Sequence, residues 1–202
     1  MDEQTDAMRE HVRSALPGAG AHGFDHTCRV VHLCELLGAR EGADMRVLIP
    51  AALFHDIARP LEEATGVPHE EEGARMAESF LRSIRYPADC IPGIVHAIRA
   101  HRYSGSIAPE TQEARILSDA DNLDAMGAIG IARTFLQAGE RGALPAEGLR
   151  GGIPDATGHI RGKLLHLKAR MYTESARRIA ERRHAFLTTF LEVLDGEVHD
   201  RS

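Results

Sequence analysis

Residues 51–60 read AALFHDIARP and place a histidine and an aspartate side by side at the end of an apolar run. The residues VLIPAALF before the pair carry no charge, which predicts a buried helix with His55 and Asp56 at its inner end. Burying a carboxylate costs free energy unless it is paired or binds a metal ion. A structural contact between the two side chains is one explanation, and a metal site completed by distant residues is the other.

Apolar residues recur with a helical period almost throughout the chain. Stripes at intervals of three and four residues occur in the stretches 30–37, 48–55, 76–84, 91–100, 112–136 and 160–194. No sustained alternation of apolar and polar residues argues for a strand. We therefore expect an all-α fold, with a long C-terminal helix formed by the last of these stripes.

The domain organisation is expected to be simple. We expect one domain over residues 1–202, with a core at about 20–136, a loop at 137–159 and a C-terminal helix at about 160–195. The loop, QAGERGALPAEGLRGGIPDATGH, is rich in glycine and proline, and a loop of this length is usually functional or disordered. It is either a mobile surface loop or a lid, in which case Arg141, Arg150 or His159 would face an anionic ligand.

Composition limits the expected partners and location. The net charge is −6, aromatic residues make up 4% and tryptophan is absent, so we expect no binding to a nucleic acid polymer. No apolar run approaches the ~20 residues that span a membrane, and the acidic start MDEQTDAMRE does not resemble a secretory signal. Cys28, Cys34 and Cys90 form no CxxC pair, which favours reduced thiols in a cytoplasmic protein. A homodimer is compatible with the sequence.

Two distant stretches supply further residues of the metal-ligand type. In HGFDHTCRVVHLCELL, residues 22–37, His26 opens a helix and Arg29 lies one turn further along the same side. In ARILSDADNLDAMGAIGIAR, residues 114–133, Asp119, Asp121 and Asp124 interrupt an otherwise apolar helix. Because these carboxylates repel one another, at least one must be neutralised by a cation, a base or a ligand.

Together these stretches resemble the HD-domain metal-dependent phosphohydrolases, whose order is H…HD…D on separate helices of an all-α bundle. The segments HGFDHTCRV, AALFHDIARP, HEEEGA, VHAIRAHRYS and DADNLDAMGAIGIAR are similar to the branch of uncharacterised hydrolases that contains the bacterial YedJ and YpgQ proteins. The resemblance covers most of the chain, from about residue 20 to 190. It implies that His26, His55, Asp56 and Asp121 hold one divalent cation.

Two imidazoles and two carboxylates suit several divalent ions. We expect Mn²⁺, with Fe²⁺, Co²⁺, Ni²⁺, Zn²⁺ and, less well, Mg²⁺ as alternatives. Such an ion would polarise a phosphate and lower the pKa of a water towards neutrality. Asp124, one turn after Asp121, either orients a histidine ligand or forms a salt bridge, and we expect Asp119 to face elsewhere.

Arg59 is a departure from the family pattern. Several HD nucleotidases carry a glutamate or an acidic pair within one turn after the HD pair, whereas this chain reads IARP. The planar guanidinium of Arg59 suits phosphate oxygens and cannot act as a base near neutral pH. A surface salt bridge is the other explanation for this residue. An acid–base role would then fall to the metal ion, Glu62, Glu70 or Asp124.

Further histidines and cations are candidates for binding the substrate. Some HD relatives add histidines to build a second metal site, for which the candidates are His69, His96 and His101. We favour one tightly bound ion, with His101 and His69 as substrate-binding or second-site groups. Lys163 and Lys168 are further anion-binding candidates, although a solvated helix face is the favoured explanation for either lysine.

The predicted function is hydrolysis of a phosphate ester or phosphoanhydride of a small metabolite, with a nucleotide preferred. The candidate catalytic residues are Asp56, Arg59, His101 and Asp124, and the candidate substrate-binding residues are Arg29, Arg59, His69, His101 and Lys163. The resemblance further implies removal of pyrophosphate from nucleoside triphosphates. An HD-type oxygenase with two irons and a non-catalytic nucleotide-sensing module remain the alternatives.

Overall fold

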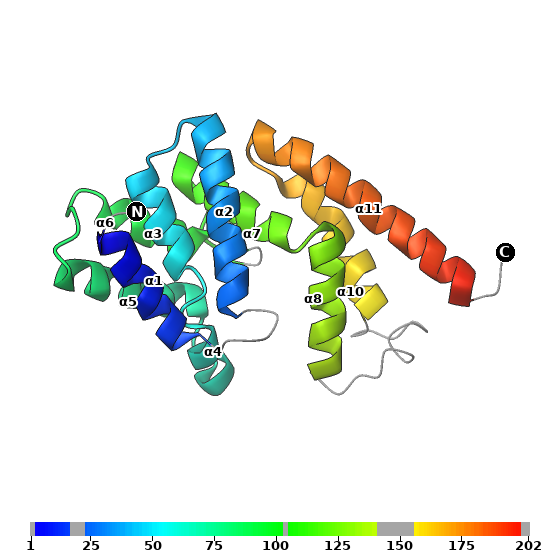
Figure 1. The fold of residues 1–202 in the computed structure, drawn as a ribbon, viewed down its shortest axis with the longest axis horizontal. Helices are drawn as coiled ribbons and strands as arrows, with labels where there is room; N and C mark the ends of the chain where they lie inside the picture. Colours follow the sequence, from blue (N-terminus) through cyan, green and yellow to red (C-terminus); the bar gives the residue numbers. More distant parts are fainter. Residues whose placement is uncertain (1–2, 17–22, 103–104, 141–155, 199–202) are drawn as a thin grey trace. The chain divides into compact units, whose positions relative to one another are not determined.

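The computed structural model describes residues 3–16, 23–102, 105–140 and 156–198, and within these ranges every regular element is a helix (Figure 1). The predicted all-α fold is therefore confirmed. The chain divides into two compact units, Met1–Asp121 and Asn122–Ser202. The division falls inside helix α7, Gln112–Asp124. Each unit is described separately below, and one domain over the whole chain stays a prediction.

The first unit is built around the stretch that carries the HD pair. Its helices before α7 are α1 (Glu3–Ala15), α2 (Phe24–Glu41), α3 (Met45–Phe54), α4 (Arg59–Thr65), α5 (His69–Ser83) and α6 (Ile91–Ala100). Helix α3 packs against α1, α2, α5 and α6, which explains why its sequence MRVLIPAALF is apolar on nearly every side. The side chain of Asp44 caps this helix by accepting a hydrogen bond from the Arg46 backbone N–H at 2.9 Å.

Pro50 lies inside α3 and leaves one backbone carbonyl without its helical donor. Proline has no N–H, so the carbonyl of Arg46, four residues earlier, cannot accept the usual bond from residue 50. The hydroxyl of Tyr86 donates to this carbonyl oxygen at 2.8 Å. A side chain from the segment after α5 therefore completes the helix that ends at the HD pair.

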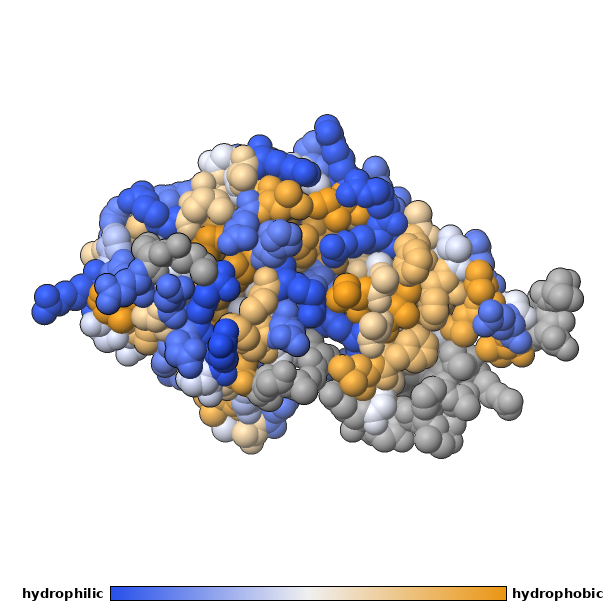
Figure 2. All heavy atoms as spheres, viewed as in Figure 1, coloured by the Kyte–Doolittle hydropathy of each residue, from blue (hydrophilic) through white to orange (hydrophobic). Residues whose placement is uncertain are grey.

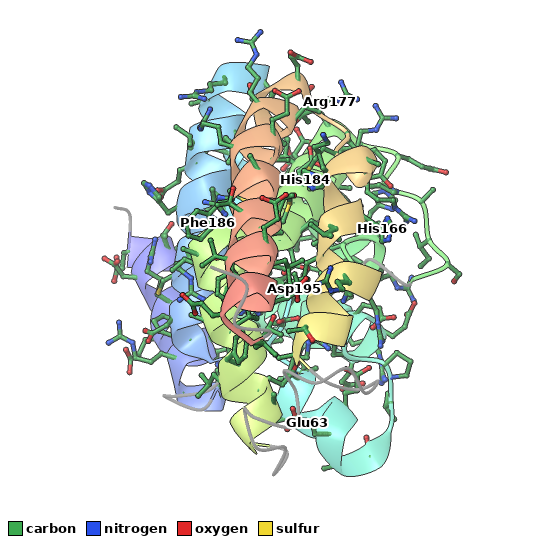
Figure 3. The ribbon with its side chains drawn as sticks, turned by 90° about the vertical axis from the view of Figure 1, so that its right-hand side faces the viewer. Glu63, His166, Arg177, His184, Phe186 and Asp195 are labelled. Carbon is green, nitrogen blue, oxygen red and sulfur yellow. The ribbon has the colours of Figure 1, made fainter. Side chains whose placement is uncertain are left out.

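The second unit contains α8 (Gly127–Glu140), α10 (Ala156–Gly162), the 3₁₀ helix η1 (Leu164–Arg170) and α11 (Glu174–Val198). Helix α11 packs against α8 and η1, and α10 packs against the same two elements. The long C-terminal helix is confirmed, and Figure 3 shows Arg177, His184 and Phe186 along it. The helix begins at Glu174, later than expected. The apolar residues of the preceding 3₁₀ helix recur every three residues, so in the sequence they look like a continuation of the α-helical pattern.

The predicted loop is shorter at both ends than its composition suggested. Helix α8 continues to Glu140 and α10 begins at Ala156, so His159 lies in a helix. Arg141 and Arg150 lie outside the described residues, and the role of this segment as a lid stays a prediction.

Two properties of the described surface concern partners. Among the described helices, none combines the length and apolar character needed to cross a bilayer. Apolar side chains gather over α8 and the end of α11 (Figure 2), where Ile129, Leu136 and Val193 are exposed. Exposed apolar side chains are normal on globular proteins, so the homodimer stays a prediction.

Candidate functional site

His55 and Asp56 follow the last turn of α3 and are buried, with relative exposures of 0% and 1%. The His55 Nδ1 lies 2.7 Å from the carbonyl oxygen of Ala52. Because a carbonyl only accepts, Nδ1 carries the proton and Nε2 presents its lone pair to the interior. Burial lowers the pKa of His55 to about 4, so the imidazole is neutral near pH 7.

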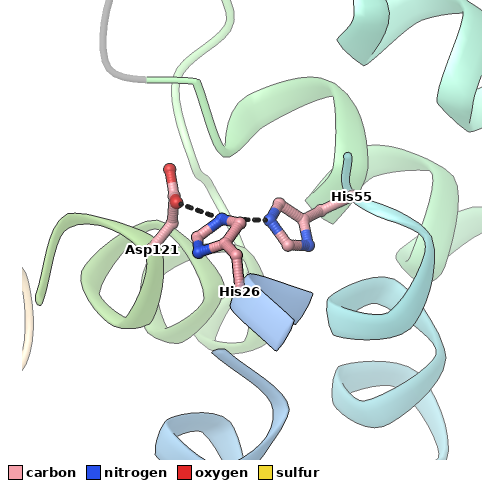
Figure 4. Close-up of side chains that lie close together, drawn as sticks. All are labelled: His26, His55 and Asp121. Atoms are coloured by element: carbon pink, nitrogen blue, oxygen red, sulfur yellow. Dashed lines mark hydrogen bonds and ion pairs between the residues drawn. The ribbon is translucent and has the colours of Figure 1, made fainter. Parts of the chain in front are cut away.

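The four residues named as metal ligands from the sequence lie together. His26 comes from the start of α2 and Asp121 from α7, and their Nε2 and Oδ1 atoms are 3.3 Å apart (Figure 4). The His26 Nε2 is also 3.3 Å from the His55 Nε2 and 3.5 Å from the Asp56 Oδ2. The distance from the His55 Nε2 to the same Asp56 oxygen is 3.7 Å.

This set of donors fits one divalent ion. Donor atoms that share an ion at about 2.0–2.2 Å lie roughly 3–3.5 Å apart, close to the 3.3–3.7 Å measured among the four side chains. Burial by itself raises the pKa of Asp121, but the hydrogen bond and charge of His26 outweigh it, and the pKa lies below its usual range. The neutral His55 and the ionised Asp121 are thus in the protonation states that metal ligands require.

A second cluster surrounds the other oxygen of Asp56. The Asp56 Oδ1 lies 3.3 Å from the His69 Nε2 and 3.6 Å from the His101 Nε2, and these two nitrogens are 3.3 Å apart. All three side chains are buried. Asp56 therefore presents one oxygen to each cluster. His96 lies apart, and its Nε2 accepts a hydrogen bond from the Glu110 backbone N–H at 3.1 Å.

His101 repeats the local arrangement of His55. It follows the last turn of α6, and its Nδ1 lies 2.5 Å from the carbonyl oxygen of Ile98, three residues earlier. The last carbonyls of a helix lack helical donors, so they are ready acceptors for such a ring N–H. Burial alone would lower the pKa of His101, but its hydrogen bond to Asp56 and the charge of that carboxylate raise it above the ordinary value.

An ion-pair network borders the second cluster. Arg59 donates through Nε to the Asp56 Oδ1 at 3.0 Å and through Nη1 to the Glu62 Oε2 at 3.1 Å. Arg102 donates through Nη1 to the Glu62 Oε1 at 2.8 Å and to the Glu70 Oε2 at 2.9 Å. Burial tends to raise the pKa of Glu62, but its contact with His69 and the positive charges of Arg102 and Arg59 lower it on balance.

The side chains around Asp56 carry an excess of negative charge that a cation would balance. Four carboxylates lie in the two clusters and their network, and the guanidiniums of Arg59 and Arg102 neutralise two of them. Two negative charges are left over among Asp56, Glu62, Glu70 and Asp121. One divalent ion would balance this excess if the imidazoles are neutral. Arg102 was missed by sequence reasoning, and its only signal was its position directly after His101.

The remaining candidates lie elsewhere in the chain. Asp124 is buried in the second unit, where Arg133 donates to its Oδ2 at 2.7 Å. Lys163, also in the second unit, is exposed at the start of η1. Arg29 is half-buried on α2. Roles of these three residues in catalysis or substrate binding stay predictions.

Comparison with known proteins points to one family. The HD domain family model matches residues 23–126. The chain is 34% identical to YpgQ of Bacillus subtilis over 200 residues, which cover 97% of this chain and 94% of YpgQ. The crystal structure of YpgQ in complex with ADP has a TM-score of 0.80 at 30% identity and covers 96% of this chain and 98% of that one.

Two further crystal structures carry the same family description. One is a predicted HD superfamily hydrolase from an uncultured Thermotogales bacterium, with a TM-score of 0.71 and 31% identity over 95% of this chain and 91% of that one. The other is an HD-superfamily hydrolase from Bacillus thuringiensis, with a TM-score of 0.77 and 30% identity over 98% of this chain and 97% of that one. The similarity to these proteins spans both compact units.

Proposed function

Since the chain belongs to the HD-domain family, we propose that it is a metal-dependent phosphohydrolase acting on a small phosphorylated metabolite, with a nucleotide as the preferred class. One observation carries this proposal. Donor atoms of the buried His26, His55 and Asp56 and of the partly exposed Asp121, which come from three separate parts of the chain, lie 3.3–3.7 Å apart. The crystal structure of YpgQ with ADP supports a nucleotide ligand for this relative.

His26, His55, Asp56 and Asp121 would hold the ion, which would supply Lewis-acid polarisation of a phosphate and acidify a water. The protein's own groups then bind and orient the substrate. Arg59 reaches Asp56 directly, so its guanidinium is placed to neutralise charge that develops on a phosphate at the ion. His101 and His69 lie on the same side of Asp56 and can hold a proton or a phosphate oxygen there.

The choice of bond in this proposal rests on the family resemblance and not on the site geometry. Removal of pyrophosphate from nucleoside triphosphates is the specific activity that we propose to test first. Mn²⁺ as the ion and a cytoplasmic location are part of the same proposal.

The second cluster favours one alternative function. Asp56, His69 and His101 supply three further donors, which is what an HD-type oxygenase with two irons would need. Protein isolated with two equivalents of iron and an optical signature in air would support this alternative. A non-catalytic nucleotide-sensing module would instead bind nucleotide stoichiometrically without turnover.

The decisive experiment is product analysis with metal-stripped protein. Mn²⁺ is restored, and nucleoside mono-, di- and triphosphates are offered to the wild type and to the Asp56→Ala variant. We expect the wild type to release phosphate or pyrophosphate and the variant to release none, and the product identifies the bond. Absence of turnover with every nucleotide would contradict the nucleotide assignment.

A further inference from the structure

Glu62, on α4, contacts His69 of the second cluster and two arginines at the border of that cluster. Its Oε2 accepts from the His69 Nδ1 at 2.8 Å and from the Arg59 Nη1 at 3.1 Å, and its Oε1 accepts from the Arg102 Nη1 at 2.8 Å. The Glu62 side chain is 20% exposed, whereas His69 is fully buried. One carboxylate at the edge of the site thus touches a buried imidazole and two partly exposed guanidiniums.

The contacts of the His69 Nδ1, with the Glu62 Oε2 at 2.8 Å and more weakly with the Glu70 Oε2 at 3.3 Å, determine which ring nitrogen faces the cluster. A carboxylate only accepts, so the His69 Nδ1 must carry a proton to satisfy it. The Nε2 is then the atom directed at the Asp56 Oδ1 and the His101 Nε2, both within 3.3 Å. Because a charge-assisted hydrogen bond is stronger than a neutral one, Glu62 holds this ring orientation more firmly than an amide would.

Both arginines keep a second carboxylate partner besides Glu62. Arg59 donates to the Asp56 Oδ1 at 3.0 Å, and Arg102 donates to the Glu70 Oε2 at 2.9 Å. Their side chains are 23% and 31% exposed, so they border solvent. Removing the charge of Glu62 would therefore leave both guanidiniums less neutralised at the edge of the site. Each guanidinium would still be held by its second carboxylate partner.

We propose that Glu62 is a positioning residue that orients His69 and holds Arg59 and Arg102 at the edge of the metal site until a phosphate group of the substrate replaces it on the guanidiniums. This inference rests on the proposed phosphohydrolase function. It requires that the Glu62 carboxylate competes with the incoming anion for the two arginines. The charge of Glu62 then weakens ground-state binding of the anion and supports turnover through His69.

The test compares Glu62→Gln with Glu63→Gln in the full chain loaded with Mn²⁺. Glu63 is the next residue of α4, is exposed and is labelled in Figure 3, so it is a matched control. We expect Glu62→Gln to bind inorganic pyrophosphate at least threefold more tightly by calorimetry, to lower KM by a similar factor and to lower kcat at least tenfold. Glu63→Gln should change none of these values.

A spectroscopic readout tests the same residue without turnover. In metal-free protein, which avoids broadening by Mn²⁺, the Nδ1 proton of His69 is assigned by its loss in His69→Gln. It should lie far downfield in the ¹H spectrum and move upfield in Glu62→Gln only. Unchanged or weaker pyrophosphate binding, or an unmoved His69 proton, would overturn the proposal. If the wild type hydrolyses nothing, the proposed function fails, whereas the binding and NMR results still decide the role of Glu62.

A second pair of variants covers the case that Glu62→Gln folds poorly. Arg102→Gln should weaken pyrophosphate binding at least threefold, because it removes one of the two charges that Glu62 holds. Arg99→Gln is the control, since Arg99 pairs with Glu71 on the surface at 2.5 Å. Equal pyrophosphate affinities in these two variants would also overturn the proposal.

Discussion

At the residue scale, Asp56 is the centre of the site because its two oxygens serve different partners. Oδ2 faces His26 and His55, and Oδ1 faces His69 and His101. The rings of His55 and His101 are oriented in the same way, each by a carbonyl three residues earlier in the last turn of a helix. Such backbone acceptors set the tautomer of a histidine ligand and make Nε2 the metal-facing atom.

We predict that His26→Ala abolishes tight binding of the divalent ion, whereas His32→Ala does not. Both residues lie on α2, but the His32 side chain is 79% exposed and the His26 side chain is buried in the cluster. Loss of a ligand should weaken Mn²⁺ at least ~100-fold, since loss of a supporting partner alone costs ~10–100-fold. Calorimetric titration of metal-stripped protein measures this difference, and equal affinities in the two variants would contradict the ligand assignment.

At the element scale, the segment after α5 is linked to the first turn of α3. Helix α5 ends with the backbone pattern in which the Tyr86 N–H bonds to the Leu81 carbonyl and the Arg85 N–H to the Arg82 carbonyl. This turn requires a left-handed residue, and Arg85 occupies it with φ of 54°. The turn delivers Tyr86 to the carbonyl that Pro50 leaves open in α3.

Replacing Tyr86 by phenylalanine should lower the free energy of unfolding by about 1 kcal/mol, because one carbonyl of α3 loses its donor. Urea unfolding measures this change. In a Pro50→Ala background the alanine N–H can donate to the Arg46 carbonyl. Tyr86→Phe should then lower the free energy of unfolding by a smaller amount. A cost that is equal in both backgrounds would show that the hydroxyl does not act through this carbonyl.

Arg85→Gly should raise the free energy of unfolding by roughly 0.5–1 kcal/mol. Glycine adopts positive φ without the steric penalty that a side chain incurs, and it is the residue that usually ends helices in this pattern. Thermal unfolding of the variant should show a higher Tm than the wild type. A lower Tm would mean that the Arg85 side chain contributes more than its backbone conformation costs.

At the scale of the whole molecule, the buried titratable cluster couples stability to pH and to metal. In the metal-free protein His55 has a pKa of about 4, against an ordinary value of 6.5 in the unfolded chain. Between these values the unfolded state takes up a proton that the folded state does not, so folding is weakened as pH falls from 6.5 to 4. The lowered pKa of Asp121 acts in a separate window, below its ordinary value of 3.8.

We predict that metal-free protein loses stability from about pH 6.5 to 4, with His55 contributing ~1.4 kcal/mol for each unit of its pKa shift. The raised pKa of His101 opposes this trend, since its contribution is present at low pH and is lost as pH rises. Urea unfolding in a chelator at pH 7 and pH 4.5 measures the slope. His55→Asn should show a smaller loss between the two pH values, and an equal loss would contradict this origin.

Several features follow from the sequence because they depend on local order. The helical period of the apolar residues predicts the all-α fold, and the buried HD pair favours a metal site. The resemblance to the HD-domain family then implies His26 and Asp121 as the further ligands. The start of the last helix was placed too early, since η1 and α11 share the same spacing of apolar residues. Asp124 was left with two explanations, and only the structure shows the 2.7 Å contact with Arg133.

The sequence by itself determined the helical class, the family and the residue types that can hold an ion, because all three are expressed in residue order and spacing. The tertiary structure decided which atoms meet. It brought His69 and His101 to the second oxygen of Asp56 and joined Arg102 to Glu62 across 40 residues. These contacts arise where the ends of α3 and α6 and the starts of α4 and α5 meet, and that meeting depends on helix packing, which no local spacing encodes.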